Sequence, residues 1–308
     1  MTKISVVMPS YNAARYIEEA INSVITQSEE DWELIVVDNN STDGTREIIQ
    51  AYKDSRITME TVENHGSIGL SRNIGISKAK GKYVAFLDAD DAWYKEKLKF
   101  TLETLEMGFD LVSHAEQWVW DNGRTRNVNY GRYKKPEYKN LLLQGNCLST
   151  SAVSVKASVL RAVQGFSEKL EVSPIEDYEL WLRIALDGYS IKIIDNCLGI
   201  YRVHNGNTIS QPGVYLRAMT EVLNNHFSLA QNSYIDIRTQ NRRVSDLYSE
   251  VAGMEITAAR FSSGIKLMFS SYKLSPRPRK EMLLPIVGIK NFVSNFLFGV
   301  AKKTKSEH

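Results

Sequence analysis

The N-terminal part of the chain alternates between two hydrophobic periods, and this alternation is the feature that most constrains the fold. Short β-branched or aromatic runs occur at residues 4–8, 32–37, 56–62 and 82–87. Segments with helical periodicity lie between them, at residues 13–27, 43–53 and 69–79. Strands that are almost continuously apolar are typical of a sheet covered on both faces. The order strand, helix, strand, helix predicts a parallel α/β sheet of the nucleotide-binding type, which binds ligands at the carboxyl ends of its strands.

Polar loops follow three of these predicted strands. The sequence reads "PSYN" at 9–12 after the first strand, "DNNSTDG" at 38–44 after the second and "DADD" at 88–91 after the fourth. A single loop could be polar for solvation alone. Three such loops on one rim of a parallel sheet indicate a functional site at that rim.

Asp88 and Asp90 form an Asp-x-Asp pair directly after an apolar run, with no lysine or arginine beside them. Residues two apart on a strand share a face, so both carboxylates are expected to point the same way. Clustered hard oxygen ligands suit Mg²⁺ or Mn²⁺. A solvated turn is the alternative for a lone pair, and it loses weight here because the pair follows a strand in a βαβ arrangement.

The rest of the chain is less regular. We expect a strand and hairpin over 109–123 with its turn at Asp121-Asn122-Gly123, and a polar surface segment over 124–146. A strand that runs into a short helix is expected over 147–163, an amphipathic helix over 174–188, and two strands at 189–195 and 197–204. From about residue 213 the pattern becomes helical.

Four ordered motifs carry a family resemblance. The stretches "ISVVMPSYNAARYIEEAINSVITQ", "ELIVVDNNSTDGT", "NHGSIGLSRNIGISKAKGKYVAFLDADD" and "IEDYELWLR", within residues 3–205, resemble the motifs of family 2 glycosyltransferases. The resemblance implies the GT-A fold, which is a Rossmann-like α/β fold with a mostly parallel central sheet flanked by helices. We expect a catalytic domain over 1–212, with a nucleotide-binding half at about 1–91 and an acceptor half at about 92–212. A helical C-terminal extension is expected over 213–308, with a basic amphipathic tail from about 265.

The resemblance also implies donor-binding residues. Pro9, Ser10 and Tyr11 correspond to the loop that cups the nucleobase, although a tyrosine there could instead pack on the sheet. Asp38 matches the aspartate that accepts a hydrogen bond from the base, and in isolation it could cap the next helix. Asp88 is expected to face the ribose or a metal-bound water. Family members usually continue "DDGS" where this chain has "DNNS", which leaves the preferred base more open.

The same resemblance assigns residues to the diphosphate and the metal. Arg72 is expected to reach the phosphates, with a surface arginine as the alternative. Asp90 is expected to bind the metal directly, whereas Asp91 is expected to cap the following helix. Arg202 is expected at the diphosphate and His204 at the metal, although a lone histidine is often structural.

Catalysis needs a base for the acceptor hydroxyl. In the family's "ED" motif the aspartate is the base, so Asp177 is the predicted catalytic residue and Glu176 is expected to orient the site or the acceptor. A helix N-terminus favours an ionised carboxylate, but acidic residues are also common in first helical turns for structural reasons. Trp181, one turn further on, is expected either to pack against a sugar of the acceptor or to lie in the core.

These assignments predict a metal-dependent, inverting glycosyltransferase that uses Mn²⁺ or Mg²⁺. It would move one sugar from a nucleotide diphosphate sugar, most simply a UDP-sugar, to a glycan acceptor. The acceptor is expected to be polyprenyl-diphosphate-linked, as in the assembly of surface polysaccharides or glycoprotein glycans. The "QRxRW" motif of processive synthases is absent, which favours single transfers. A dinucleotide oxidoreductase is disfavoured because no G-x-G-x-x-G follows the first strand, and a non-catalytic nucleotide- or glycan-binding relative is the remaining alternative.

Charge and hydropathy bear on partners and location. A net charge of +2 gives no general attraction to nucleic acid. There is no signal-peptide pattern and no apolar run of about 18 residues, so a cytoplasmic location is expected. Residues 260–308 carry ten Lys or Arg and two acidic residues among large apolar ones, which favours peripheral binding to the inner face of the cell membrane. The alternative is that this segment packs on the catalytic domain or on a second subunit of a homo-oligomer.

Overall fold

The computed structural model describes residues 3–129, 136–204, 211–229 and 234–276. The chain divides into two compact units, residues 1–207 and 208–308. The expected division was at residue 212, and the finer division of the catalytic domain near residue 91 stays a prediction. Of the amphipathic tail expected from about residue 265, the part from 277 onward lies outside the described residues.

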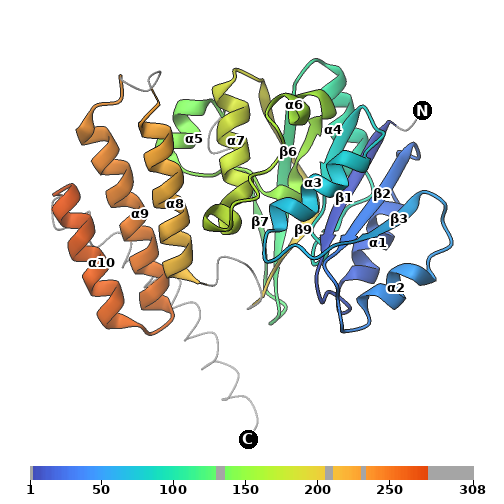
Figure 1. Ribbon diagram of the computed structural model, residues 1–308, viewed down its shortest axis with the longest axis horizontal. Helices are drawn as coiled ribbons and strands as arrows, with labels where there is room; N and C mark the ends of the chain where they lie inside the picture. The colour runs from blue at the N-terminus through green and yellow to red at the C-terminus, as the bar shows by residue number, and fades with distance from the viewer. Residues whose placement is uncertain (1–2, 130–135, 205–210, 230–233, 277–308) are drawn as a thin grey trace, which may run out of the picture. The chain divides into compact units, whose positions relative to one another are not determined.

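The first unit is built on one sheet (Figure 1). Its strands in the described residues are β1 (Ile4–Ser10), β2 (Trp32–Asp38), β3 (Ile57–Thr61), β4 (Tyr83–Phe86), β5 (Ala92–Trp93), β6 (Leu111–Trp120), β7 (Thr125–Val128), β8 (Ser154–Lys156) and β9 (Ile191–Val203). They are ordered β3-β2-β1-β4-β8-β6-β9-β5, and β7 pairs with β6 outside this path. The block β3-β2-β1-β4 is parallel, and so is the pair β6–β9. The pairs that involve β5, β7 and β8 are antiparallel, so the α/β fold class is confirmed with a mixed sheet.

Helices cover both faces of this sheet. They are α1 (Ile17–Ile25), α2 (Thr45–Ala51), α3 (Ile68–Lys78), α4 (Lys97–Glu106), α5 (Tyr138–Gln144), α6 (Ala157–Ala162) and α7 (Glu176–Leu186), with 3-10 turns η1 (Thr150–Ala152) and η2 (Leu170–Ile175). Apolar residues of α1 and α4 pack with Val6, Met8 and Val36 of the strands in one core. On the other face α3 lies against β1 so closely that a Cβ at Gly75 would overlap the side chain of Val7. The fully covered sheet explains why β1 and β2 are apolar at almost every position.

Three elements differ from the sequence expectations. The two strands expected at 189–195 and 197–204 are one strand, β9, with a register irregularity opposite Ala115. The helix expected from Pro174 starts at Glu176, because Pro174 lies in the 3-10 turn η2. The polar segment expected over 124–146 contains β7 and α5.

The second unit is helical in its described residues, which agrees with the expected C-terminal extension. It contains α8 (Pro212–Phe227), α9 (Ile237–Thr257) and α10 (Phe261–Leu274). Helices α9 and α10 pack together through small residues: Ser245 Oγ donates to the carbonyl of Ser271 at 2.9 Å. A Cβ at Gly264 would overlap Ile256, so glycine is needed for this close approach. None of the helices in the described residues is long and apolar enough to cross a membrane.

Candidate active site

The carboxyl ends of β1, β2 and β4 meet at one edge of the sheet. Ser10 and Asp38 are paired in register at the ends of β1 and β2, and β4 lies on the other side of β1. Residues 88–91, called the acid loop below, follow β4. The three polar loops predicted to share a rim therefore do so.

Hydrogen bonds fix the acid loop at both ends. Asp91 is buried, and its carboxylate accepts hydrogen bonds from Ser151 Oγ at 2.6 Å and from the backbone N–H of Arg202 at 2.9 Å. Ser151 Oγ also accepts from the backbone N–H of Asp88 at 3.1 Å. The expectation that Asp91 caps a helix is wrong, because α4 starts only at Lys97 and Asp91 instead ties the loop to β9.

Asp90 and His204, the two predicted metal ligands, lie side by side. His204 Nε2 lies 2.9 Å from Asp90 Oδ2, and both side chains are partly exposed. Burial, and then the charge of Asp88, raises the pKa of Asp90, whereas His204 lowers it. A carboxylate whose pKa is raised by a neighbouring carboxylate is compatible with a bound cation. In the described part of the chain no group of three or more His, Cys, Asp or Glu is arranged around one point, so an ion here would take its other ligands from water and phosphate, as Mg²⁺ and Mn²⁺ sites commonly do.

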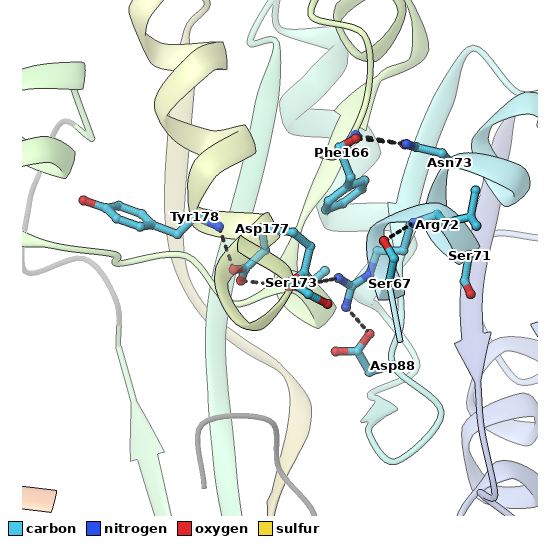
Figure 2. Close-up of polar contacts among 12 residues, drawn as sticks. Ser67, Ser71, Arg72, Asn73, Asp88, Phe166, Ser173, Asp177 and Tyr178 are labelled. Carbon is cyan, nitrogen blue, oxygen red and sulfur yellow. Dashed lines mark hydrogen bonds and ion pairs between the residues drawn. The ribbon is translucent and has the colours of Figure 1, made fainter. Parts of the chain in front are cut away.

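Arg72 connects the acid loop to helix α7. Its buried guanidinium donates to Asp88 Oδ1 at 2.7 Å and to Glu176 Oε1, and it lies over the ring of Phe166 at 5.2 Å. Figure 2 shows Arg72 between Asp88 and the start of the helix that carries Asp177. Both terminal nitrogens of Arg72 are thus held by carboxylates here, and its contact with a diphosphate stays a prediction.

Glu176 and Asp177 open helix α7 beside this arginine. Burial raises the pKa of Glu176 to about 8, although the Arg72 guanidinium opposes the rise. Burial likewise raises the pKa of Asp177, again against Arg72. Asp177 accepts a hydrogen bond from Thr150 Oγ1 at 3.0 Å, which orients its carboxylate. The expected stabilisation of the ionised form by the helix N-terminus is therefore outweighed by burial, and the result is a carboxylate with increased proton affinity.

The loop after β1 presents one exposed aromatic ring. Tyr11 is 63% exposed, whereas Pro9 lies within the buried strand. Ser10 is buried, and its Oγ has no hydrogen-bond partner in the described structure. An exposed ring beside a buried hydroxyl without a partner is compatible with the predicted nucleobase contact, which stays a prediction.

Asp38 organises the loop after β2. It has no exposed surface, and its carboxylate accepts from the N–H and the Oγ of Ser41, at 3.0 and 2.5 Å. Asn39 Oδ1 accepts from the backbone N–H of Asn64 at 2.8 Å, which ties this loop to the segment before α3. Asn39, which stands where family members usually have a second aspartate, thus connects two loops of the site. The predicted hydrogen bond from Asp38 to the base stays a prediction, and a base that reached Asp38 would have to displace Ser41.

The predicted contact of Trp181 with an acceptor sugar is wrong. Trp181 has no exposed surface and lies in an aromatic cluster with Phe86 and Phe166, at centroid distances of 6.4 and 6.2 Å. A fully buried indole cannot stack on a sugar. Trp181 is a core residue, which was the alternative prediction. The aromatic cluster supports the ring of Phe166, on which Arg72 lies.

Sequence reasoning missed Thr150 and Ser151. Both come from η1, next to β8, and the antiparallel pairing of β8 with β4 places η1 beside the acid loop. Their only sequence signal is the hydroxyl run "STS" at 149–151 before a strand. Thr150 contacts Asp177 over a sequence separation of 27 residues, and Ser151 contacts Asp91 over 60 residues. Separations of this size leave no regular spacing that could be recognised in the sequence.

Comparison with known proteins gives consistent matches. Residues 5–162 match the family model "Glycosyl transferase family 2". TuaG of Bacillus subtilis, named as a teichuronic acid biosynthesis glycosyltransferase, is 34% identical over 209 residues, which cover 67% of this chain and 81% of TuaG. WfgD of Escherichia coli, named UDP-Glc:alpha-D-GlcNAc-diphosphoundecaprenol beta-1,3-glucosyltransferase, is 31% identical over 228 residues, which cover 71% of this chain and 85% of WfgD.

Solved structures share the fold at lower identity. S. aureus TarS 1-349 in complex with UDP has a TM-score of 0.58 and 22% identity, and the match covers 90% of this chain and 93% of that one. The mannosyltransferase PcManGT from Pyrobaculum calidifontis, in complex with GDP-Man and Mn²⁺, has a TM-score of 0.61 and 16% identity, with 94% and 80% covered. At these identities the likeness is one of fold.

Proposed function

The chain belongs to glycosyltransferase family 2, and from that membership we propose that it transfers a single sugar, with inversion, from a UDP-sugar to a lipid-linked glycan. It is a glycosyltransferase with a GT-A-type fold; the donor, the metal, the acceptor and the residue roles are proposals. UDP is favoured by the TarS complex, and the lipid-linked acceptor by the name of WfgD. The observation that carries the proposal is the Arg72 bridge between Asp88, on the donor side, and the Glu176–Asp177 pair.

The donor would lie along the carboxyl edge of the sheet. Tyr11 and Ser10 would contact the base, and Asp88 the ribose. Arg202, whose guanidinium donates to the backbone carbonyl of Asp90 at 2.6 Å, would lie at the diphosphate. A divalent ion held by Asp90 and His204 would neutralise charge on the leaving diphosphate.

Asp177 would act as the base. As the acceptor oxygen forms its bond to the anomeric carbon, Asp177 takes the hydroxyl proton, and the bond from that carbon to the phosphate oxygen breaks with its electron pair going to the diphosphate. The raised pKa of Asp177 increases its affinity for this proton. Thr150 holds the carboxylate in position, and Glu176 with Arg72 fixes the start of α7.

The proposed acceptor places the enzyme at the inner face of the cell membrane. Helix α10 offers a described surface for this: Phe261, Ile265, Phe269 and Tyr272 are 59%, 51%, 63% and 43% exposed. Their spacing puts them on one side of the helix. Aromatic and aliphatic side chains beside Lys266 and Lys273 suit the interface of an anionic membrane.

Asp177→Asn tests the catalytic assignment. We expect transfer to fall about a hundredfold or more, because the amide cannot accept the proton. A thermal-shift screen of nucleotide diphosphates with and without Mn²⁺ should show the same stabilisation for the variant as for the wild type, with UDP and Mn²⁺ together giving the largest shift. Asp187→Asn, at the exposed end of the same helix, is the matched control.

Two outcomes would contradict the proposal in different ways. Transfer by Asp177→Asn at the wild-type rate would remove the base assignment. A wild-type protein that no nucleotide diphosphate stabilises, with or without Mn²⁺, and that transfers no sugar would instead be the non-catalytic relative.

A further inference from the structure

A row of three aromatic rings lies on one face of the sheet where β6 leaves the core. The ring of Trp118 lies 6.0 Å from that of Trp120 and 5.3 Å from that of Tyr201. Trp118 and Trp120 are two apart on β6 and so share a face, and Trp118 pairs in register with Tyr201 of β9. Along β6 the residues are buried up to Glu116 and partly exposed from Gln117 onward, and Tyr201 is partly exposed as well.

One end of the row adjoins the acid loop. Tyr201 immediately precedes Arg202, whose backbone N–H donates to Asp91 at 2.9 Å and whose guanidinium donates to the carbonyl of Asp90 at 2.6 Å. Burial raises the pKa of Tyr201, and the charges of the acid-loop carboxylates raise it further. The phenol therefore lies within electrostatic reach of the proposed donor site.

Two arginines lie beside the tryptophans of the row. The guanidinium of Arg124 lies over the ring of Trp120 at 4.9 Å. Arg126 on β7 pairs in register with Trp118, so its side chain is on the same face as the rings. Both arginines are exposed. A ligand that followed the aromatic row away from the acid loop would meet positive charge.

The hairpin β6–β7 also lies beside the segment between β1 and α1. Asp121 lies in the turn of this hairpin, and its carboxylate accepts a hydrogen bond from the guanidinium of Arg15 at 3.3 Å. Arg15 lies on that segment. Both side chains are exposed, so this pair adds little stability. It places the turn after Trp120 beside the segment that follows β1, so the row does not lie on a remote part of the unit.

Neighbouring, partly exposed tryptophans suit a pyranose. The faces of a sugar ring that carry C–H groups are apolar and weakly positive, and the face of an indole is apolar and negative. A hydrophobic partner protein would also cover aromatic rings, but it would not explain their continuity with the acid loop or the two arginines beside the tryptophans. Small-molecule sites typically combine aromatic walls with a few charged groups in this way.

We propose that Trp118, Trp120 and Tyr201 form the acceptor subsite, which binds the pyranose of a glycosyl phosphate or diphosphate, while Arg124 and Arg126 bind its phosphate. The proposal rests on the function proposed above, since an acceptor is bound only by a transferase. The subsite proposal goes beyond that function, because it assigns the acceptor to one face of the sheet and requires a phosphate beside the sugar. The hydroxyl at the Tyr201 end of the bound sugar is then the one closest to the reacting centre.

Trp118→Leu and Trp120→Leu test the subsite, with Trp120→Phe as the conservative variant and Tyr234→Leu, an exposed aromatic of the second unit, as the control. We expect the acceptor KM to rise about tenfold in each leucine variant, which corresponds to about 1.4 kcal/mol. Trp120→Phe should recover most of the loss. The affinity for the nucleotide, the melting temperature and the KM of the control should stay at wild-type values.

A fluorescence titration separates this inference from the proposed function, because it needs no turnover. Pyranosyl phosphates should quench the tryptophan emission of the wild type, and the quenching should disappear in the Trp118→Leu/Trp120→Leu double variant. Arg124→Ala/Arg126→Ala should weaken binding of the phosphate but not of a neutral glycoside. Undiminished quenching in the double tryptophan variant, or an unchanged acceptor KM, would overturn the subsite even in an active transferase.

Discussion

At the scale of single residues, Arg72 determines the electrostatics of the site. Its guanidinium satisfies Asp88 and Glu176, which lie 16 and 104 residues away in the sequence. Removing it would leave the buried carboxyl of Glu176 without its hydrogen-bond partner, a loss that typically destabilises a protein by about 1–3 kcal/mol. All three residues are predicted from their motifs, and the structure brings them into contact. The motifs could not pair them, because no spacing links residue 72 to residue 176.

The raised pKa of Glu176 predicts a pH-dependent stability. The folded state binds this proton more tightly than the unfolded state, since the pKa rises from 4.5 to about 8 on folding. The contribution to stability is therefore complete at low pH and is lost as the pH rises through the window from 4.5 to about 8. Glu176→Gln, which mimics the protonated carboxyl, should remove this loss. Thermal unfolding of both proteins across the window measures it.

Glu60→Gln is the control for that experiment, since Glu60 lies in a solvent-exposed ion pair with Lys78. It should leave the pH profile of the wild type unchanged. If the wild type and Glu176→Gln lose stability in parallel with rising pH, the carboxyl of Glu176 is ionised throughout and the Arg72 contact dominates over burial.

At the scale of elements, the contact between α3 and β1 positions Arg72. Gly75 lies one turn after Arg72 and has room for no side chain against Val7. Gly75→Ala should therefore destabilise the protein by about 1–3 kcal/mol, the usual cost of overpacking a core. Because α3 must shift outward, transferase activity should fall as well. Chemical denaturation and a transfer assay at low temperature check both effects.

Gly213→Ala provides the comparison. Gly213 is also helical, but its nearest neighbour to an added Cβ is Arg217 at 4.0 Å. Alanine should be neutral there or stabilising by up to about 1 kcal/mol. Equal effects of the two substitutions would mean that helix propensity, and not the packing of α3 on β1, governs the response at Gly75.

The sequence predicted the strands of the parallel block better than the later elements, for a physical reason. β1, β2 and β4 are covered on both faces, so their apolar runs end within two residues of the strand ends. β7 is a short strand with mostly exposed side chains, and only its pairing with β6 makes it a strand. β8 is three residues long and depends in the same way on β4 and β6. Elements defined by tertiary pairing leave little periodic signal.

The residues of the candidate site divide in the same way, into those with a local sequence motif and those placed only by tertiary pairing. Residues in motifs, such as Asp90, Asp177 and His204, could be proposed for the site from their local sequence, and their roles stay predictions. Ser151 could not, since its role exists only because antiparallel pairing brings η1 to the acid loop. Trp181 could be assigned to the site or to the core with equal justification until its burial was known.

At the scale of the whole molecule, charge is segregated along the chain. Residues 260–308 hold ten of the 38 basic residues and two of the 36 acidic ones, so residues 1–259 hold 28 and 34 and carry a net charge of −6. An anionic membrane would attract the C-terminal part and repel the rest. Membrane binding through α10 would therefore combine its exposed apolar face with this charge.

The double variant Phe261→Ser/Phe269→Ser tests that binding. It should sediment with phosphatidylglycerol vesicles at least several-fold less than the wild type, because about half of the exposed apolar stripe is lost. Wild-type binding should also weaken with added salt and be low on phosphatidylcholine vesicles. Met107→Ser/Leu170→Ser removes two exposed apolar residues of the first unit and should have no effect. Equal sedimentation of the two double variants would exclude α10 as the contact.

The hairpin β6–β7 presents different chemistry on its two faces, and this has a consequence for divergence among relatives. Trp118, Trp120 and Arg126 point to one side, whereas Gln117 and Asn127 point to the other and lie within hydrogen-bonding distance of each other. Loss or gain of one residue ahead of Trp118 would slip the register and exchange the two sides at every position. A single codon deletion just before Trp118 could thus turn both indoles to the opposite face and bring Val119 to the face that they occupied, without altering the scaffold. This would make the strand a place where sugar preference can change abruptly.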